Sequence, residues 1–274
     1  MVADRGVGPR LVGRTAVVVG AGQTPGATIG NGRATAVQFA RHGARVALVD
    51  RSAEQLAGTV AMIEAEVPGA EYVEVVADIA TDDGPGQVVD AVLAAFGGFD
   101  ILHNNVGIGA GDAPPHLLTD EAYDRIMDVN LRAMWRMCRA AVPELRRSGR
   151  GAIVNVSSLA AVASAGALTA YRLSKAGVNT LTTSLAFTNA KYGLRVNAIM
   201  PGFVDTPMGV DAAARAMGID RDDYAARRAA QVPLGRQGTA WDIAAAAVFL
   251  ASDDAEWITG VILPVDGGQS IRVG

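Results

Sequence analysis

Seven short apolar runs, separated by longer stretches with helical periodicity, constrain the fold of this chain more than any other feature of its sequence. The runs are rich in β-branched residues and poor in charge, which is typical of strands buried on both faces of a sheet. Buried strands that alternate with helices predict right-handed crossovers in a parallel sheet. The expected strands are Thr15–Val19, Arg45–Val49, Tyr72–Val76, a run that opens at Ile101-Leu102, Ala152–Val156, Arg195–Ile199 and Val261–Val265.

The stretches between these runs predict helices. We expect one α/β domain over residues 1–274, with a doubly wound, mostly seven-stranded parallel sheet covered by helices on both faces. The segment 208–232 fits no strand and is expected to form a helical excursion over the ligand crevice. The expected helices are Ala34–His42, Ala53–Glu66, Gly86–Phe96, Glu121–Arg147, Ala170–Tyr192 and Ala240–Leu250.

Composition excludes several classes of function. The 274 residues are 50% hydrophobic and carry a net charge of -4, so no basic footprint for nucleic acid or for a membrane surface is expected. One cysteine and three histidines far apart in sequence make a metal site unexpected. Met1 to Arg14 contains no apolar run, and no stretch of about 18 apolar residues occurs elsewhere. A cytoplasmic protein with a small-molecule partner is therefore expected.

A glycine-rich loop follows the first strand. Gly20 and Gly22 come directly after the strand, and Gly30, Asn31 and Gly32 precede the first helix. Glycines let the backbone approach a phosphate, and a helix N-terminus offers free N–H groups and the positive end of its dipole. An ordinary strand–helix turn is the alternative, but the strand before the loop and the helix after it favour a dinucleotide site.

An acidic residue, Asp50, ends the second strand. A carboxylate at this position accepts hydrogen bonds from the ribose hydroxyls of an adenosine and repels a 2′-phosphate, which favours NAD over NADP. Arg51 follows directly and can pair with a phosphate, so NADP stays an alternative. Asp50 can also be read as the cap of the next helix, although Ser52 is able to fill that role.

A tyrosine and a lysine lie four residues apart in a predicted helix. Tyr171 and Lys175 therefore share one helix face. A nearby ammonium stabilises a phenolate and lowers the tyrosine pKa, so the pair can act as an acid and base. A surface tyrosine with a solvated lysine is the alternative. Two features weigh against it: the chain has only one other lysine, and Ser158 ends a strand 13 residues before Tyr171.

Taken together, these motifs resemble the short-chain dehydrogenase/reductase family, in its single-domain branch. The resemblance extends from Thr15 to Ser270 and implies a Rossmann fold. Besides the glycine loop and the Tyr171–Lys175 pair, it rests on Asp78, Asn104-Asn105-Val106-Gly107, Asn130, Ser158, Pro201-Gly202 with Thr206, and Asp266-Gly267-Gly268.

The resemblance implies a role for each of four catalytic residues. Ser158 would orient the substrate oxygen, and Tyr171 would exchange a proton with it. Lys175 would bind the nicotinamide ribose and lower the pKa of the tyrosine. Asn130 would hold a water that connects Lys175 to solvent. The cofactor would carry the hydride.

The resemblance also implies the residues that line the cofactor site and the assembly state. Asp78 would bind the adenine edge, the segment after the fourth strand would lie under the adenosine, and the segment after the sixth strand would receive the nicotinamide carboxamide. A homotetramer is implied as well. The implied cofactor residues beyond those named above are Ile79, Asn104, Val106, Gly107, Pro201, Gly202, Val204 and Thr206.

The glycine loop departs from the family pattern. Seven residues, Gln23–Ile29, stand where one is usual, and Asn31 occupies a position where isoleucine is frequent. We expect this insertion to form a flap near the pyrophosphate or a contact between subunits.

The segments expected to line the substrate site are mostly apolar. They are Ile108–Leu118, Leu159–Thr169 and Phe203–Ala230, which favours an alicyclic, aromatic or steroid-like secondary alcohol or its ketone. Two alternatives stay open. One is a 3-oxoacyl carrier-protein reductase that uses NADPH, against which Asp50 counts; the other is a non-catalytic sensor of NAD. His103 and Cys138 are expected to be packed core residues.

Overall fold

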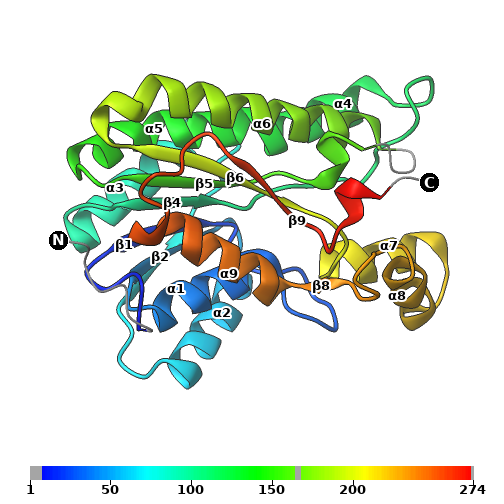
Figure 1. Ribbon diagram of the computed structural model, residues 1–274, viewed down its shortest axis with the longest axis horizontal. Coiled ribbons are helices and arrows are strands. Elements are labelled where there is room, and N and C mark those ends of the chain that lie inside the picture. Colours follow the sequence, from blue (N-terminus) through cyan, green and yellow to red (C-terminus); the bar gives the residue numbers. More distant parts are fainter. Residues whose placement is uncertain (1–7, 164–167, 273–274) are drawn as a thin grey trace.

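The computed structural model describes residues 8–163 and 168–272 (Figure 1). Part of the segment Met1–Arg14 and part of Leu159–Thr169, both discussed above, lie outside the described residues. Among the described helices, none is long and apolar enough to cross a membrane.

Seven parallel strands form the central sheet, which confirms the predicted doubly wound α/β fold. The strand order is β3-β2-β1-β4-β5-β6-β9, so the order reverses beside β1, which pairs with both β2 and β4. A ligand crevice is expected at the carboxyl ends of these two strands. The strands are β1 (Thr15–Val19), β2 (Arg45–Asp50), β3 (Tyr72–Val76), β4 (Ile101–Asn104), β5 (Ala152–Val156), β6 (Arg195–Pro201) and β9 (Ile262–Val265).

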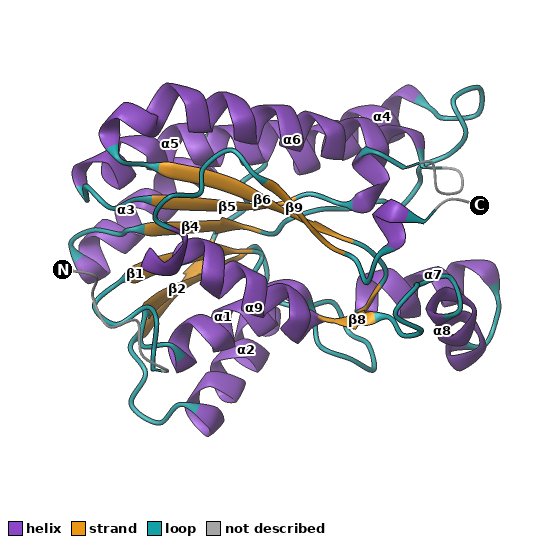
Figure 2. Ribbon diagram, viewed as in Figure 1, coloured by secondary structure: helices purple, strands orange, loops and turns teal. Residues whose placement is uncertain are grey.

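Helices cover both faces of the sheet (Figures 1 and 2). Strand residues alternate between the two faces, so Ala16 and Val18 pack into one apolar cluster while Val17 and Val19 pack into the other. Because both faces are buried, each strand is apolar along its length. One face carries α1 (Asn31–Arg41), α2 (Ala53–Glu66) and α9 (Ala240–Ala251), and the other carries α3 (Gly84–Phe96), α5 (Ala133–Arg147) and α6 (Thr169–Asn189).

The predicted helix over Glu121–Arg147 was wrong in its middle. The structure has α4 (Asp120–Met127), a π-helical turn over Asp128–Arg132 and then α5, in which the N–H of Ala133 donates to the carbonyl oxygen of Asp128. Hydrophobic periodicity does not register one extra residue in a single turn, so the sequence could not predict it. The first helix also differs, because α1 begins at Asn31 rather than at Ala34.

Residues 204–239, hereafter the excursion, leave the sheet after β6 and return to α9. In Figure 1 its helices α7 and α8 lie beyond the end of the sheet from which the β6 ribbon leaves. A small two-stranded parallel sheet, which the sequence did not predict, forms at the base of the excursion. Its elements are β7 (Val204–Asp205), a π-helical turn (Pro207–Asp211), α7 (Ala212–Met217), α8 (Arg221–Ala229) and β8 (Gly238–Thr239). Elsewhere, 3-10 turns lie at Leu159–Ala161, Ala190–Tyr192, Asp253–Ala255 and Gln269–Ile271.

Candidate active site

The glycine loop after β1 forms a cradle that side chains would fill. Gly20 has a φ of +81°, which favours glycine. A Cβ on Gly32 would lie 1.9 Å from the carbonyl oxygen of Gly20, and a Cβ on Gly22 would lie 2.7 Å from the carboxylate of Asp50. At Gly30 an added Cβ would come no closer than 3.6 Å to Gln23, so steric crowding does not require this glycine.

Asp50 lies beside this cradle and organises it. Its Oδ2 accepts the N–H of Gly22 at 3.0 Å, and its Oδ1 accepts the N–H of Ser52 at 3.1 Å. Ser52, rather than Asp50, is the N-cap of α2, because its hydroxyl accepts the N–H of Gln55. Arg51 is exposed.

The amino end of α1 faces the same loop. Gln23 closes the inserted segment, because its Oε1 accepts the N–H of Gly30 at 2.7 Å and its Nε2 donates to the carbonyl oxygen of Thr28 at 3.0 Å. The Oδ1 of Asn31 is buried and has no hydrogen-bond partner within the described part of the chain. A buried, unpartnered amide oxygen at a helix N-terminus beside a glycine cradle is available to a bound ligand.

Helix α6 brings Lys175 under the end of β5. The ammonium group donates to the carbonyl oxygen of Val156 at 2.9 Å, and the side chain is 2% exposed. Burial lowers the pKa of Lys175 to about 8. Gly107 leaves room for this group, since a Cβ there would lie 3.2 Å from the Lys175 Nζ.

Tyr171 lies one helical turn before Lys175. Its ring centroid is 5.7 Å from the Lys175 Nζ. Burial raises the pKa of Tyr171, and a hydrogen bond with Ser158 opposes that rise. Ser158 follows β5, and its Oγ also accepts the N–H of Ala160 at 3.2 Å. The structure therefore brings Ser158, Tyr171 and Lys175 together at the carboxyl end of β5.

Asn130 joins this group from the π-helical turn. Its side chain is fully buried, and Oδ1 accepts the N–H of Ile108 at 2.7 Å. Its Nδ2 donates to the carbonyl oxygen of Ile108 at 2.9 Å and to the Ser174 hydroxyl at 3.1 Å. The amide of Asn130 therefore fixes the loop after β4 against α6.

The side chain of Asn104 is buried rather than open to the crevice. Its Nδ2 donates to the Asn155 Oδ1 at 2.9 Å and contacts the Cys138 sulfur at 3.3 Å. Burial raises the pKa of Cys138 to about 12, so this thiol is a packed core group. Asn105, which the sequence reasoning did not select, instead donates to the carbonyl oxygen of Gly20 at 3.4 Å.

Val106 and the two residues after β3 complete the adenosine side. A Cβ on Gly20 would lie 3.1 Å from the Val106 Cγ2, so the valine packs directly on the cradle. The Oδ1 of Asp78 accepts the N–H of Ala80 at 2.9 Å, and Ile79 is 5% exposed.

Pro201, Gly202, Val204 and Thr206 continue from the end of β6 into the excursion. Gly202 is crowded, because a Cβ there would lie 2.4 Å from the Gln269 Oε1. Val204 pairs with Gly238 in the small sheet. The Thr206 hydroxyl accepts the N–H of Gly209 at 3.1 Å and so caps the following turn.

Asp112 is a residue of this site that the sequence reasoning missed. It lies in the loop after β4, yet its Oδ1 accepts the N–H groups of Thr169 and Ala170, both at 3.0 Å, and its Oδ2 accepts the N–H of Tyr171 at 2.8 Å. The N-cap residue of α6, Leu168, has no capping side chain. No sequence pattern links an aspartate to a helix that begins 57 residues later, so only the fold reveals this cap.

These residues fit a dinucleotide. The cradle of Gly20, Gly22 and Gly32 leaves room for a pyrophosphate at the amino end of α1, and Asp50 offers an acceptor for ribose hydroxyls beside it. The carboxyl end of β5 supplies a hydroxyl, a phenol and an ammonium group, which together suit proton exchange with a substrate oxygen.

Comparisons with known proteins agree with this description. Residues 26–270 match the family model described as Enoyl-(Acyl carrier protein) reductase. The chain is 34% identical over 271 residues to levodione reductase of Leifsonia aquatica, covering 98% of this chain and 99% of that protein. It is 35% identical over 265 residues to a 2,5-dichloro-2,5-cyclohexadiene-1,4-diol dehydrogenase of Sphingobium indicum, covering 96% and 99%.

Solved structures are similar over the same length. A crystal structure of levodione reductase superimposes with a TM-score of 0.91 at 33% identity, covering 96% of this chain and all of that chain. Carveol dehydrogenase from Mycobacterium avium in complex with NAD gives a TM-score of 0.88 at 28% identity, covering 96% and 100%. In sequence and in fold, the chain belongs to the short-chain dehydrogenase/reductase family, and it is an oxidoreductase that acts on alcohol groups.

Proposed function

We propose that this enzyme is an NAD-dependent dehydrogenase that interconverts an apolar cyclic secondary alcohol and its ketone. One observation carries the proposal. Ser158, Tyr171 and Lys175 meet at the carboxyl end of β5, and the Lys175 ammonium is buried there under a loop that Asn130 holds in position. Residues 1–274 act as one domain that holds both cofactor and substrate, with the excursion covering the crevice.

Each proposed catalytic residue has a separate task. The Ser158 hydroxyl binds the substrate oxygen, and Tyr171 takes the alcohol proton in oxidation or returns it in reduction. A protonated Lys175 favours the phenolate of Tyr171 and hydrogen-bonds the ribose of the nicotinamide nucleotide. Asn130 holds Ile108, and through it the substrate-side loop, against α6. The bound nicotinamide supplies the hydride acceptor or donor.

The proposed cofactor preference rests on Asp50. Its carboxylate lies against Gly22 at the end of β2, where it accepts ribose hydroxyls and repels a 2′-phosphate. Arg51, which is exposed, provides the only neighbouring charge in the sequence that favours a phosphate. The solved complex of carveol dehydrogenase holds NAD, which supports the same preference.

Two kinds of support favour a cyclic, apolar substrate. The segments that flank the site include Ile108, Leu159 and Phe203, which are apolar. Relatives of similar sequence are named for levodione and for a cyclohexadiene diol. We further propose that the enzyme is a cytoplasmic homotetramer, as the family resemblance implies, which light scattering on the purified protein would test.

The first experiment is to follow the absorbance of reduced nicotinamide with NAD or NADP and a panel of cyclic secondary alcohols. We expect turnover with NAD, and Tyr171→Phe should lower kcat/KM by about 10²–10⁴-fold. Thr180→Val, an exposed position on the same helix, is the matched control.

Other outcomes point to other functions. Turnover with NADP alone on 3-oxoacyl substrates would contradict the proposal and favour a carrier-protein reductase. Tight binding of NAD with no turnover of any alcohol by the wild-type protein would favour a sensor.

A further inference from the structure

The insertion Gln23–Ile29 contacts the excursion through neighbouring residues. Gly26 packs against Pro207 so closely that a Cβ on the glycine would lie 2.6 Å from the Pro207 Cβ. The N–H of Ala27 donates to the Asp211 Oδ1 at 3.0 Å. These contacts join segments that are about 180 residues apart in sequence.

A group of charged residues lies behind this contact. The Thr28 hydroxyl donates to the carbonyl oxygen of Asp205 at 3.2 Å. Arg221, the first residue of α8, pairs with Asp205 at 2.6 Å and with Asp211 at 3.4 Å. The Asp211 side chain is only 12% exposed, so these interactions are less screened than those of a surface pair. One guanidinium thus fixes both carboxylate residues that the insertion contacts.

The insertion is held equally well at its other end. Gln23 bridges Gly30 and Thr28, so the segment is closed onto the residue that precedes α1. The same segment therefore has one attachment at the glycine cradle and the other on the turn that Thr206 caps.

We propose that the insertion is a clamp that joins the two walls of the dinucleotide site, with Asp211 and Arg221 as its positioning residues. The inference rests on the proposed function, in which the glycine cradle holds the pyrophosphate and the segment ending at Thr206 holds the nicotinamide half. Because the clamp ties the excursion to the cradle, it slows the movement of that segment that would release the nicotinamide half. The adenosine half, bound at Asp50, does not depend on it.

The test measures the release of NADH from its binary complex by stopped-flow fluorescence, without any substrate. Asp211→Ala removes the acceptor for Ala27 and one partner of Arg221, and we expect NADH to dissociate about tenfold faster, which corresponds to about 1.4 kcal/mol. The affinity for ADP-ribose, which lacks the nicotinamide, should stay within about twofold of the wild-type value. Asp223→Ala, at an exposed aspartate of the same helix α8, is the matched control.

Two further measurements separate the clamp from a general loss of folding. Thr28→Val removes only the hydroxyl that donates to Asp205 and should accelerate release in the same direction by a smaller factor. Amide hydrogen exchange of the ligand-free Asp211→Ala protein should increase in residues 23–30 and 205–211 together, while β1 stays protected.

Each outcome decides between the two proposals. An unchanged rate of NADH release in both variants would overturn the clamp and leave the proposed function intact. An equal loss of affinity for ADP-ribose would also overturn the clamp, because the variant would then have loosened the whole site. A wild-type protein that binds neither NADH nor NADPH would overturn the proposed function itself.

Discussion

The carboxylate of Asp112 accepts the backbone N–H of Tyr171 at 2.8 Å, so a loop that follows β4 fixes the first turn of the helix that carries the proposed acid and base. The same carboxylate accepts the N–H groups of Thr169 and Ala170. The first N–H groups of a helix have no partner within the helix, and a negative charge there is also favoured by the helix dipole. Asp112 is thus a positioning residue for Tyr171.

Replacing Asp112 should therefore affect both stability and turnover. We expect Asp112→Ala to lower the free energy of unfolding by about 1–2 kcal/mol, because three N–H groups lose their acceptor. We also expect kcat to fall more than the affinity for NAD, since Tyr171 moves while the glycine cradle does not. Asp112→Asn keeps an acceptor oxygen and should recover part of kcat.

Urea denaturation and steady-state kinetics measure the two effects. Asp90→Ala, at an exposed aspartate of α3, is the control and should change neither. An Asp112→Ala protein with lower stability but an unchanged kcat would limit Asp112 to a structural role.

The pH dependence of oxidation should depend on Lys175. In the structure without a bound nucleotide, burial raises the pKa of Tyr171, so the phenol is protonated at neutral pH and oxidation should become faster as the pH rises. Burial lowers the pKa of Lys175 to about 8, so the ammonium that stabilises the phenolate is itself lost in mildly alkaline solution. Lys175→Met removes the ammonium, and the rise of kcat/KM should move to higher pH.

Profiles of kcat/KM against pH report the free enzyme and are the measurement to make. Lys191→Met removes the other lysine of the chain, which is exposed, and should leave the profile unchanged. A Lys175→Met profile that rises at the wild-type pH would show that the ammonium does not assist Tyr171.

The strands could be predicted from sequence because each is an apolar run that ends at a polar or glycine residue. The predicted bounds of β1, β3 and β5 agree with the structure, as do those of α2. The sequence could not predict β7 and β8, because two-residue strands carry no periodicity. The π-helical turn at Asn130 was missed for a similar reason.

The candidate site was predictable only where neighbours in sequence are also neighbours in space. Tyr171 and Lys175 share a helix face, and Ser158 ends the strand before it, so spacing brought them together. Asp112 and Asp211 act on backbone groups of segments that are distant in sequence, and nothing local distinguishes them from solvated aspartates. Their identification required the tertiary structure.

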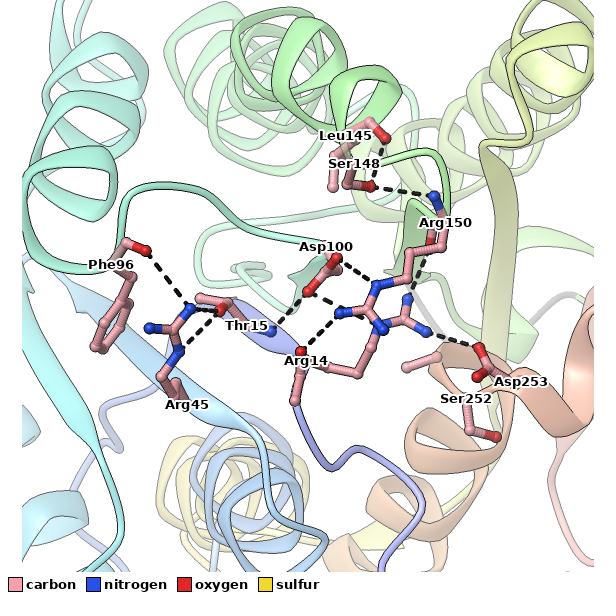
Figure 3. A network of polar contacts seen from close by, with 12 residues as sticks. Arg14, Thr15, Arg45, Phe96, Asp100, Leu145, Ser148, Arg150, Ser252 and Asp253 are labelled. Carbon is pink, nitrogen blue, oxygen red and sulfur yellow. Dashed lines mark hydrogen bonds and ion pairs between the residues drawn. The ribbon is translucent and has the colours of Figure 1, made fainter. Parts of the chain in front are cut away.

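A polar network at the opposite edge of the sheet should stabilise the fold without affecting the site (Figure 3). Asp100, which precedes β4, accepts the N–H of Thr15 at 2.9 Å and the Arg150 Nε at 3.0 Å, and it faces the buried Arg14. We expect Asp100→Ala to lower the free energy of unfolding by about 2–3 kcal/mol, because these donors lose a charged acceptor. Differential scanning calorimetry measures the loss.

Turnover supplies the contrast for Asp100. These residues precede the strands, whereas Ser158 and Tyr171 follow one, so kcat of the folded Asp100→Ala protein should equal that of the wild type at low temperature. Asp82→Ala breaks an ion pair whose carboxylate is 91% exposed, and it should cost little stability. A loss of kcat at full folding would mean that the two edges of the sheet are coupled.

His103 should make the protein less stable in mild acid. Its side chain is fully buried on β4, its ring packs at 6.0 Å from the Phe39 ring, and neither ring nitrogen has a hydrogen-bond partner among the described residues. Burial lowers the pKa of His103 to about 3, whereas an unfolded histidine titrates near its ordinary value of 6.5. Below pH 6.5 the unfolded state therefore binds a proton that the folded state does not.

The sign follows from this difference in bound protons. The contribution of His103 is constant above pH 6.5, and stability decreases by about 1.4 kcal/mol for each pH unit as the pH falls from 6.5 towards 3. His103→Leu removes the titrating group and should flatten this part of the dependence, as measured by urea denaturation at several pH values. His116→Gln, at an exposed loop histidine, is the control and should keep the wild-type slope. An unchanged slope in His103→Leu would mean that carboxylates, and not this buried imidazole, cause the loss of stability in acid.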